Sequence, residues 1–224
     1  MGCGASSEAL AFCGTEMRTS IYVDGFNLYF GALKGTSYKW LDIQAMCKAL
    51  LNPDNEITSI KYFTAYVSGT PQNQKRALDQ QIYIRALRRM TPNLEVITGQ
   101  FSTHEVTKKL VLPIAGQSHA LVYETTEKGS DVNLAVHLVN DSWLNKFDAA
   151  VVISGDSDLA ESINLVRKYH PKKAVGVIAP GKRSMSKRLL YASSFVRAVS
   201  TTVLAASQFP SHIPGTNIFK PSDW

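Results

Sequence analysis

The chain has 224 residues, of which 45% are hydrophobic, and it carries a formal net charge of +6 at pH 7. This length is ample for one large domain with a proper core, and no apolar run is long enough to span a membrane. Cys3, Cys13 and Cys47 are too few and too scattered for a disulfide framework or a cysteine-rich zinc site. The reducing cytoplasm is therefore the expected compartment, and the positive charge suits a polyanionic partner.

Neither end of the chain is predicted to form regular secondary structure, and at the carboxyl end Phe219 and Trp224 are candidates for docking an extended tail. Residues 1–16 are rich in Gly, Ala and Ser and lack the positively charged region of a secretory signal. The first residues match a myristoylation pattern, with Cys3 available for palmitoylation, but we favour a leader outside the fold, or a translation start placed upstream of Met17. We predict a disordered leader over 1–17, a domain over 18–204 and an extended tail over 205–224, where prolines exclude regular structure.

The first predicted strand, 20–23, ends at Asp24, and a helix begins at Gly25. Asn27 falls in the first turn of this helix, from where its amide can reach back toward Asp24. A capping role is the alternative for Asn27. The junction places polar side chains at the carboxyl end of a strand, which is where open α/β sheets bind ligands.

An aromatic-rich, alternating segment over 57–67 predicts a second strand, and a long helix is expected over 72–90. Arg85, Arg88 and Arg89 share one face of that helix. We expect these arginines to contact substrate, and a solvated helix face is the alternative.

Residues 104–116 indicate an inserted hairpin or arm, because two lysines lie between short apolar runs and a proline and a glycine interrupt the pattern. After a strand over 119–125, a helix is expected to carry Asp131 in its first turn. Lys128 is close enough in sequence to neutralise a carboxylate or to contact a phosphate. A negative charge in the first turn also suits the helix dipole, which is the structural alternative for Asp131.

The most informative stretch begins with a strand over 147–153 whose last residues form a continuous apolar run, as in a buried parallel strand. Asp156 and Asp158 follow this strand, and two carboxylates so close together destabilise the fold unless a cation or hydrogen bonds hold them. The structural alternatives are a turn-stabilising role for Asp156 and an N-cap role for Asp158. The candidate ligands are Asp156 and Asp158, and the candidate substrate contacts in the same turn are Ser154 and Ser157.

A further strand over 173–178 leads into a basic segment. Residues 176–182 match the spacing of a phosphate-binding P-loop, but Arg183 stands where that loop needs Ser or Thr to bind a metal. We therefore reject a nucleotide P-loop. Lys182 and Arg183 are retained as candidates for contacts to phosphate.

The alternation of strands and helices predicts an α/β fold with a mostly parallel sheet. Asp24, Asp131 and the Asp156/Asp158 pair each follow a predicted strand, and the carboxyl ends of parallel strands lie at one edge of a sheet. If the strands before Asp24 and Asp156 are neighbours, the acids converge on one cup. Oxygen ligands of this kind suit Mg²⁺ or Mn²⁺, and such an ion can activate water and bind a phosphodiester.

Three segments carry a family resemblance: Asp24-Gly25-Phe26-Asn27-Leu28-Tyr29, Glu127-Lys128-Gly129-Ser130-Asp131-Val132 and Ser154-Gly155-Asp156-Ser157-Asp158-Leu159. They resemble the motifs of NYN domains of the LabA-like group, in the PIN-like nuclease superfamily. The resemblance covers about residues 19–200 and implies a three-layer α/β/α, PIN-like (Rossmann-like) fold with a metal-dependent ribonuclease site. It implies that the metal is held by Asp24, Asp131, Asp156 and Asp158, with Asn27 beside them.

Three functions agree with these patterns. The leading hypothesis is a Mg²⁺- or Mn²⁺-dependent endoribonuclease with RNA as its partner, whose arginine and lysine patches bind the RNA backbone. The second is a non-catalytic RNA- or protein-binding module that keeps the fold, and the third is a small-molecule phosphatase. Metal-dependent cleavage of RNA compared with a small phosphoester separates them. No membrane partner is expected, and a homo-oligomer is compatible with the sequence.

Overall fold

A computed structural model of the protein describes residues 16–67, 73–114, 116–181 and 185–224. Its centre is a parallel sheet of six strands in the order β3-β2-β1-β6-β7-β8. The predicted α/β fold with a parallel sheet is confirmed, and β1 and β6, which precede Asp24 and Asp156, are neighbours. The strands are β1 (Met17–Asp24), β2 (Asn55–Thr64), β3 (Leu94–Thr98), β6 (Ala149–Ile153), β7 (Ala174–Ala179) and β8 (Phe195–Ala198).

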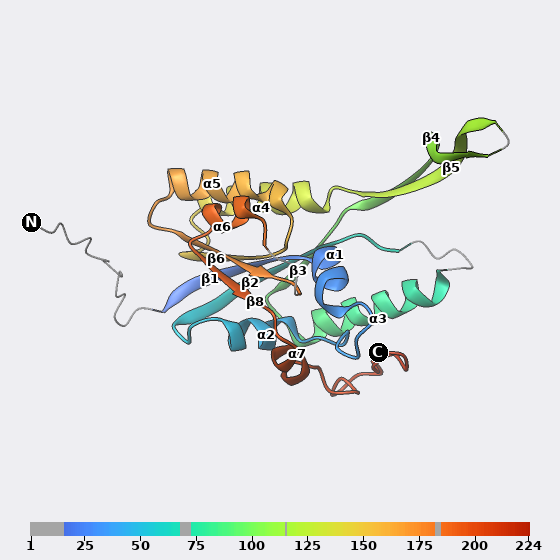
Figure 1. Cartoon of the computed structure of the whole chain (residues 1–224). Helices are drawn as coiled ribbons and strands as arrows, with labels where there is room; N and C mark the ends of the chain where they lie inside the picture. Colours follow the sequence, from blue (N-terminus) through green and yellow to red (C-terminus); the bar gives the residue numbers. More distant parts are fainter. Residues whose placement is uncertain (1–15, 68–72, 115, 182–184) are drawn as a thin grey trace, which may run out of the picture.

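Helices cover both faces of the sheet (Figure 1). Consecutive strand residues point to opposite faces, so Ile21 and Val23 join one hydrophobic cluster while Tyr22 joins the other. Both clusters are fully buried at the sheet, which explains why the central strands read as continuous apolar runs. On one side lie α2 (Ile43–Leu50), α3 (Gln74–Met90) and α7 (Thr201–Ala206), and on the other α4 (Ser130–Trp143), α5 (Ala160–Tyr169) and α6 (Lys187–Ala192).

The predicted hairpin is present as a long antiparallel arm of β4 (Gln100–Ile114) and β5 (Gln117–Lys128), which extends away from the body of the molecule (Figure 1). The expectation that the strand before Asp131 lies in the parallel sheet is wrong, because β5 pairs with β4 in a separate two-stranded sheet. The apolar run at 120–123 lies in the strand that the sequence predicts over 119–125. In the structure Leu121 and Tyr123 are 66% and 76% exposed, so that run does not contribute to the core.

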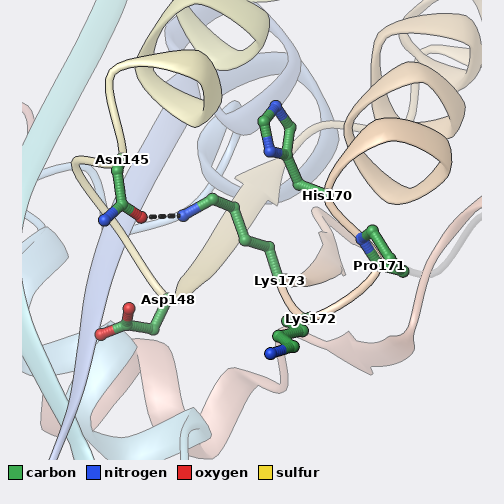
Figure 2. Close-up of a pocket in the computed structure, with 6 residues that line it drawn as sticks. All are labelled: Asn145, Asp148, His170, Pro171, Lys172 and Lys173. Atoms are coloured by element: carbon green, nitrogen blue, oxygen red, sulfur yellow. Dashed lines mark hydrogen bonds between the residues drawn. The ribbon is translucent and has the colours of Figure 1, made fainter.

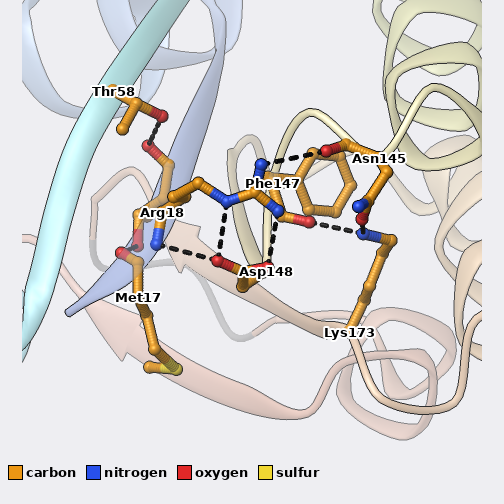
Figure 3. Close-up of polar contacts among 8 residues, drawn as sticks. Met17, Arg18, Thr58, Asn145, Phe147, Asp148 and Lys173 are labelled. Carbon is orange, nitrogen blue, oxygen red and sulfur yellow. Dashed lines mark hydrogen bonds and ion pairs between the residues drawn. The ribbon is translucent and has the colours of Figure 1, made fainter. Parts of the chain in front are cut away.

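The amino ends of β1, β6 and β7 are fastened by ion pairs and hydrogen bonds. The guanidinium of Arg18 donates to both carboxylate oxygens of Asp148, at 2.9 and 2.8 Å. Lys173 Nζ donates to the Asn145 side chain at 2.6 Å and to the Phe147 carbonyl (Figure 3). Asn145, Asp148 and Lys173 also border a hollow of about 400 Å³ (Figure 2). Acidic and basic groups compensate one another at this edge.

The segment 208–224 has no helix or strand, and it folds back on the α2–α3 side of the sheet, where Phe209, Ile213 and Ile218 join the core. Its last residue, Trp224, packs against Trp40 and Tyr83. Within the described residues, no helix has the length and apolar character needed to cross a membrane. The predicted leader, apart from residues 16 and 17, and the candidates Lys182 and Arg183 lie outside the described residues.

Candidate active site

The site begins where β1 and β6 end side by side. Because Val23 pairs with Ile153, Asp24 and Ser154 are the next residues on two neighbouring strands. Ser154 Oγ donates to Asp24 Oδ2 at 2.9 Å, and the Asn27 backbone N–H donates to Asp24 Oδ1 at 2.9 Å. Asp24 therefore caps the short helix α1 (Gly25–Leu28), and both of its carboxylate oxygens are held in place.

The side chain of Asn27 joins the two loops, and the capping alternative for Asn27 is wrong, because Asp24 is the N-cap of α1. Asn27 Oδ1 accepts a hydrogen bond from the Gly155 backbone N–H at 3.0 Å. Gly155 belongs to the loop after β6, so this bond fixes the distance between the first and third acidic segments. The predicted place of Asn27 beside the acids agrees with this geometry.

Asp156 and Asp158 lie in a turn that the chain closes by itself. Ser154 Oγ accepts from the Asp156 N–H, and Asp156 Oδ1 accepts from the Asp158 N–H, both at 3.0 Å. Asp156 is thus the N-cap of the one-turn helix η2 (Ser157–Leu159), which bears out its turn-stabilising role. The N-cap alternative for Asp158 is wrong, because Leu159 precedes α5 and makes no side-chain cap.

The carboxyl groups at this edge repel one another. Burial is the main cause that raises the pKa of Asp24, the charge of Asp156 adds to it, and hydrogen bonds from Asn27 and Ser154 oppose it. Partial desolvation, followed by the charges of Asp24, Asp156, Glu127 and Asp158, raises the pKa of Asp131 to about 6. Asp131 is therefore close enough to Asp24 for the charge of Asp24 to raise its pKa, although α4, which carries Asp131, follows the arm and not a strand of the central sheet.

Glu127 is a fifth acid at this site, which sequence reasoning did not single out. Its Oε1 accepts hydrogen bonds from Ser130 N–H at 3.1 Å and Ser130 Oγ at 2.8 Å, so it caps α4, the helix that carries Asp131. The negative charge of Glu127 also raises the pKa of Asp131. The signals that could have found it were its place at the start of the second motif segment and its position three residues before the start of α4.

The acids do not form a ready-made metal cage. In the part of the chain that the structure describes, no group of three or more His, Cys, Asp or Glu side chains is gathered closely enough to hold an ion. Mg²⁺ commonly uses only one or two protein carboxylates, together with water and substrate phosphates. The oxygen donors of Asp24, Asp131 and Asp156, with raised pKa values at two of them, fit that looser kind of site.

A cavity of about 870 Å³ opens directly from the acids. Asp24, Glu127 and Asp131 form one part of its wall, while Asp156 and Asp158 lie outside its lining. Tyr62 also lines it, and a Cβ at Gly25 would lie only 2.8 Å from the Tyr62 hydroxyl, so glycine is needed for the ring to approach the Asp24 loop. Four basic side chains that sequence reasoning missed share this cavity: Lys34, Lys39, Lys75 and Arg76.

The basic residues that were expected to bind substrate lie elsewhere. Arg85, Arg88 and Arg89 are exposed on α3, but the cavity lining on that helix ends at Tyr83. Their role in substrate binding stays a prediction, as does that of Lys128, which is exposed between Glu127 and the start of α4. Ser154 is buried against Asp24, and Ser157 begins η2 without lining the cavity.

Comparisons with known proteins agree with this architecture. A crystal structure of a Vibrio parahaemolyticus protein of unknown function superposes with a TM-score of 0.53 at 17% identity, covering 83% of this chain and 94% of that chain, which supports the fold alone. The chain is 32% identical to the 6-hydroxy-3-succinoylpyridine 3-monooxygenase HspA of Pseudomonas putida, over 93% of this chain and 75% of that protein. The family model of the NYN domain matches residues 18–198. The chain belongs to the NYN domain family.

Proposed function

We propose that this protein is a Mg²⁺- or Mn²⁺-dependent ribonuclease that hydrolyses RNA phosphodiester bonds at the acidic end of β1 and β6. The observation that carries the proposal is the gathering of Asp24, Asp131 and Asp156 at one edge of the sheet, where burial, with the charges of neighbouring acids added to it, raises the pKa of Asp24 and Asp131. Repulsion among these acids costs stability unless a cation relieves it. Membership of the NYN domain family agrees with a nuclease.

The residues divide into three roles in this proposal. Asp24, Asp131 and Asp156 would hold the ion, with Asp158 close to them, and the ion would supply Lewis acidity and water activation when bound. Asn27 and Ser154 orient Asp24 through the hydrogen bonds described above. The basic side chains on the same cavity would bind the phosphates of the RNA backbone: Lys34, Lys39, Lys75 and Arg76.

A second candidate function comes from the curated relative. HspA is named as a monooxygenase of a hydroxypyridine, and the cavity beside the acids has aromatic walls that include Phe26 and Phe101, whose rings are 5.8 Å apart. A flat aromatic substrate would pack well against such rings. Oxygenation needs dioxygen and a reductant, whereas hydrolysis needs neither, so the two functions separate cleanly in an assay.

The experiment is a comparison of substrates with one protein preparation. RNA, a small phosphoester and a hydroxypyridine are incubated with and without Mn²⁺, and the hydroxypyridine is also given a reductant under air. The proposal requires Mn²⁺-dependent RNA cleavage that far exceeds phosphoester hydrolysis. Turnover of the small phosphoester alone would identify a phosphatase, oxygen consumption with the pyridine would identify an oxygenase, and RNA binding without any turnover would identify a non-catalytic module.

Several finer assignments remain proposals beside this one. They are the endonucleolytic mode, the LabA-like group within the NYN family, a homo-oligomeric state and a cytoplasmic location. The endonucleolytic mode is tested with a circular RNA, because an RNA without ends can be cleaved only internally.

A further inference from the structure

The basic side of the cavity is already in contact with an acid of the same chain. Lys75 forms an ion pair with the carboxylate of Asp223. Lys39 Nζ donates to the Asp223 backbone carbonyl at 3.2 Å and lies over the Trp224 ring at 5.9 Å from its centroid. All four residues line the cavity into which Asp24 and Asp131 face. The Asp223 carboxylate therefore sits on Lys75 and the Asp223 backbone carbonyl on Lys39, where a phosphate would otherwise bind.

The anchor of this segment and its ionic contact have different strengths. Trp224 packs on Trp40 and Tyr83, with ring centroids 6.2 and 5.6 Å apart, and Trp40 is fully buried. The Lys75 and Asp223 side chains, in contrast, are 59% and 63% exposed. An exposed ion pair contributes little to stability, so a phosphate can replace Asp223 while the aromatic anchor keeps the segment in place.

We propose that Lys39 and Lys75, with Lys34 and Arg76 on the same cavity, form a phosphate-binding subsite that Asp223 occupies in the free protein. The subsite accepts a phosphate group because lysine ammonium groups pair with phosphate oxygens as they do with carboxylate oxygens. Asp223 acts as an internal competitor that lowers the affinity for phosphate-bearing ligands. The inference rests on the proposed function only for the choice of RNA as the main probe.

The test measures binding without chemistry. Dissociation constants of a ten-nucleotide single-stranded RNA and of a nucleoside 5′-monophosphate are measured in EDTA over a range of salt concentrations. Asp223→Asn should tighten RNA binding severalfold at low salt. Lys75→Gln should weaken RNA binding. The plot of the logarithm of the association constant against the logarithm of the salt concentration should become less steep by about 0.7, the value for one phosphate contact to a single strand.

Each variant has a control with the same change of charge. Asp54→Asn alters an exposed acid at the amino edge of the sheet, and Lys48→Gln alters an exposed cation on α2 beyond the cavity. The subsite is refuted if Asp223→Asn binds RNA like Asp54→Asn, or if Lys75→Gln binds like Lys48→Gln. If the variants change the dissociation constant of the monophosphate as well as that of the RNA, the subsite binds a single phosphate group. If only the dissociation constant of the RNA changes, the subsite binds the polymer.

The outcome is independent of whether the protein cleaves RNA. If the wild type fails to cleave RNA with Mn²⁺, but the two variants shift binding in opposite directions as expected, the ribonuclease proposal fails and the subsite stands. If cleavage occurs and the binding constants of the variants match their controls, the ribonuclease proposal stands and the subsite is wrong. Thermal unfolding of each variant checks that the fold is intact.

Discussion

The pKa values of aspartate side chains are shifted in opposite directions at the two edges of the central sheet. At the amino edge, hydrogen bonds from Arg18 are the largest cause that lowers the pKa of Asp148. At the carboxyl edge, burial and neighbouring carboxylates raise the pKa of Asp24 and Asp131. The same residue type thus becomes a structural fastener where a cation lies beside it. Where further acids lie beside it, it becomes a candidate ligand for a cation.

A fourth aspartate, which lies in the core, has a lowered pKa like Asp148 at the amino edge. Asp141 is 2% exposed and pairs with Lys61 and with Lys146, while Tyr22 donates to it at 2.8 Å. Burial acts to raise its pKa, but the hydrogen bonds outweigh burial and lower it. Negative charge is therefore paired with a cation in the core and at the amino edge. Within the described residues no ion pair forms at the acids of the carboxyl edge, which marks that edge as the candidate site.

The strongest test of the comparison exchanges one carboxylate at each edge for an amide. Asp156→Asn keeps an oxygen that can accept from the Asp158 N–H, yet RNA cleavage is expected to fall about 10²–10³-fold because transition-state charge stabilisation is lost. Asp148→Asn, the control, should leave cleavage unchanged. Initial rates with Mn²⁺ decide between them, and an Asp156→Asn protein as active as the wild type would refute the catalytic role.

The core acid provides the largest expected effect on stability. Asp141→Asn leaves the buried ammonium of Lys61 without its counter-charge, so the free energy of unfolding at pH 7 is expected to fall by about 3 kcal/mol. Because the folded pKa of Asp141 is lowered, its contribution is present above its ordinary pKa and is lost as the pH falls through the folded value. Urea denaturation at pH 7 and at acid pH measures both. An unchanged midpoint at pH 7 would contradict the compensation argument.

Addition of a divalent metal ion should stabilise the fold through the acids of the carboxyl edge and not through those of the amino edge. An ion that binds only the assembled site stabilises the fold by about 2.7 kcal/mol at a concentration of one hundred times its dissociation constant. We expect Mn²⁺ to raise the melting temperature of the wild type and of Asp148→Asn, and to raise that of Asp156→Asn much less. Equal shifts in all three proteins would place the ion away from the acidic edge.

The smallest expected effect concerns Asp131 in the absence of metal. Its folded pKa of about 6 lies above the ordinary value of 3.8, so the folded state loses stability as the pH rises between these values. Asp131→Asn should therefore be more stable than the wild type at pH 8, by up to about 1 kcal/mol because solvent screens an exposed group. The difference should vanish below pH 4. Thermal unfolding in EDTA across this range tests it, and a difference that grows toward acid pH would be the wrong sign.

The local parts of this protein were readable from the sequence. The apolar run that ends at Ile153 and the spacing from Asp24 to Asn27 predicted strand, turn and helix, because the hydrogen bonds that close these turns join residues two or three positions apart. The parallel sheet followed from the alternation of such units. Asp24, Asp156 and Asn27 were predicted to lie together, and the pairing of β1 with β6 places them so.

Only the tertiary structure decided how the site is completed. The sequence could not show that Asp131 follows the arm and not a strand of the central sheet. The reason is that an apolar run such as 120–123 looks the same in a buried strand and in an exposed arm. Lys39, Lys75 and Asp223 come from three distant segments, and their contact depends on how 208–224 packs on the α2–α3 face. Exposed charged side chains have no periodic pattern that fixes their partners, so their pairing depends on the long-range packing of the core beneath them.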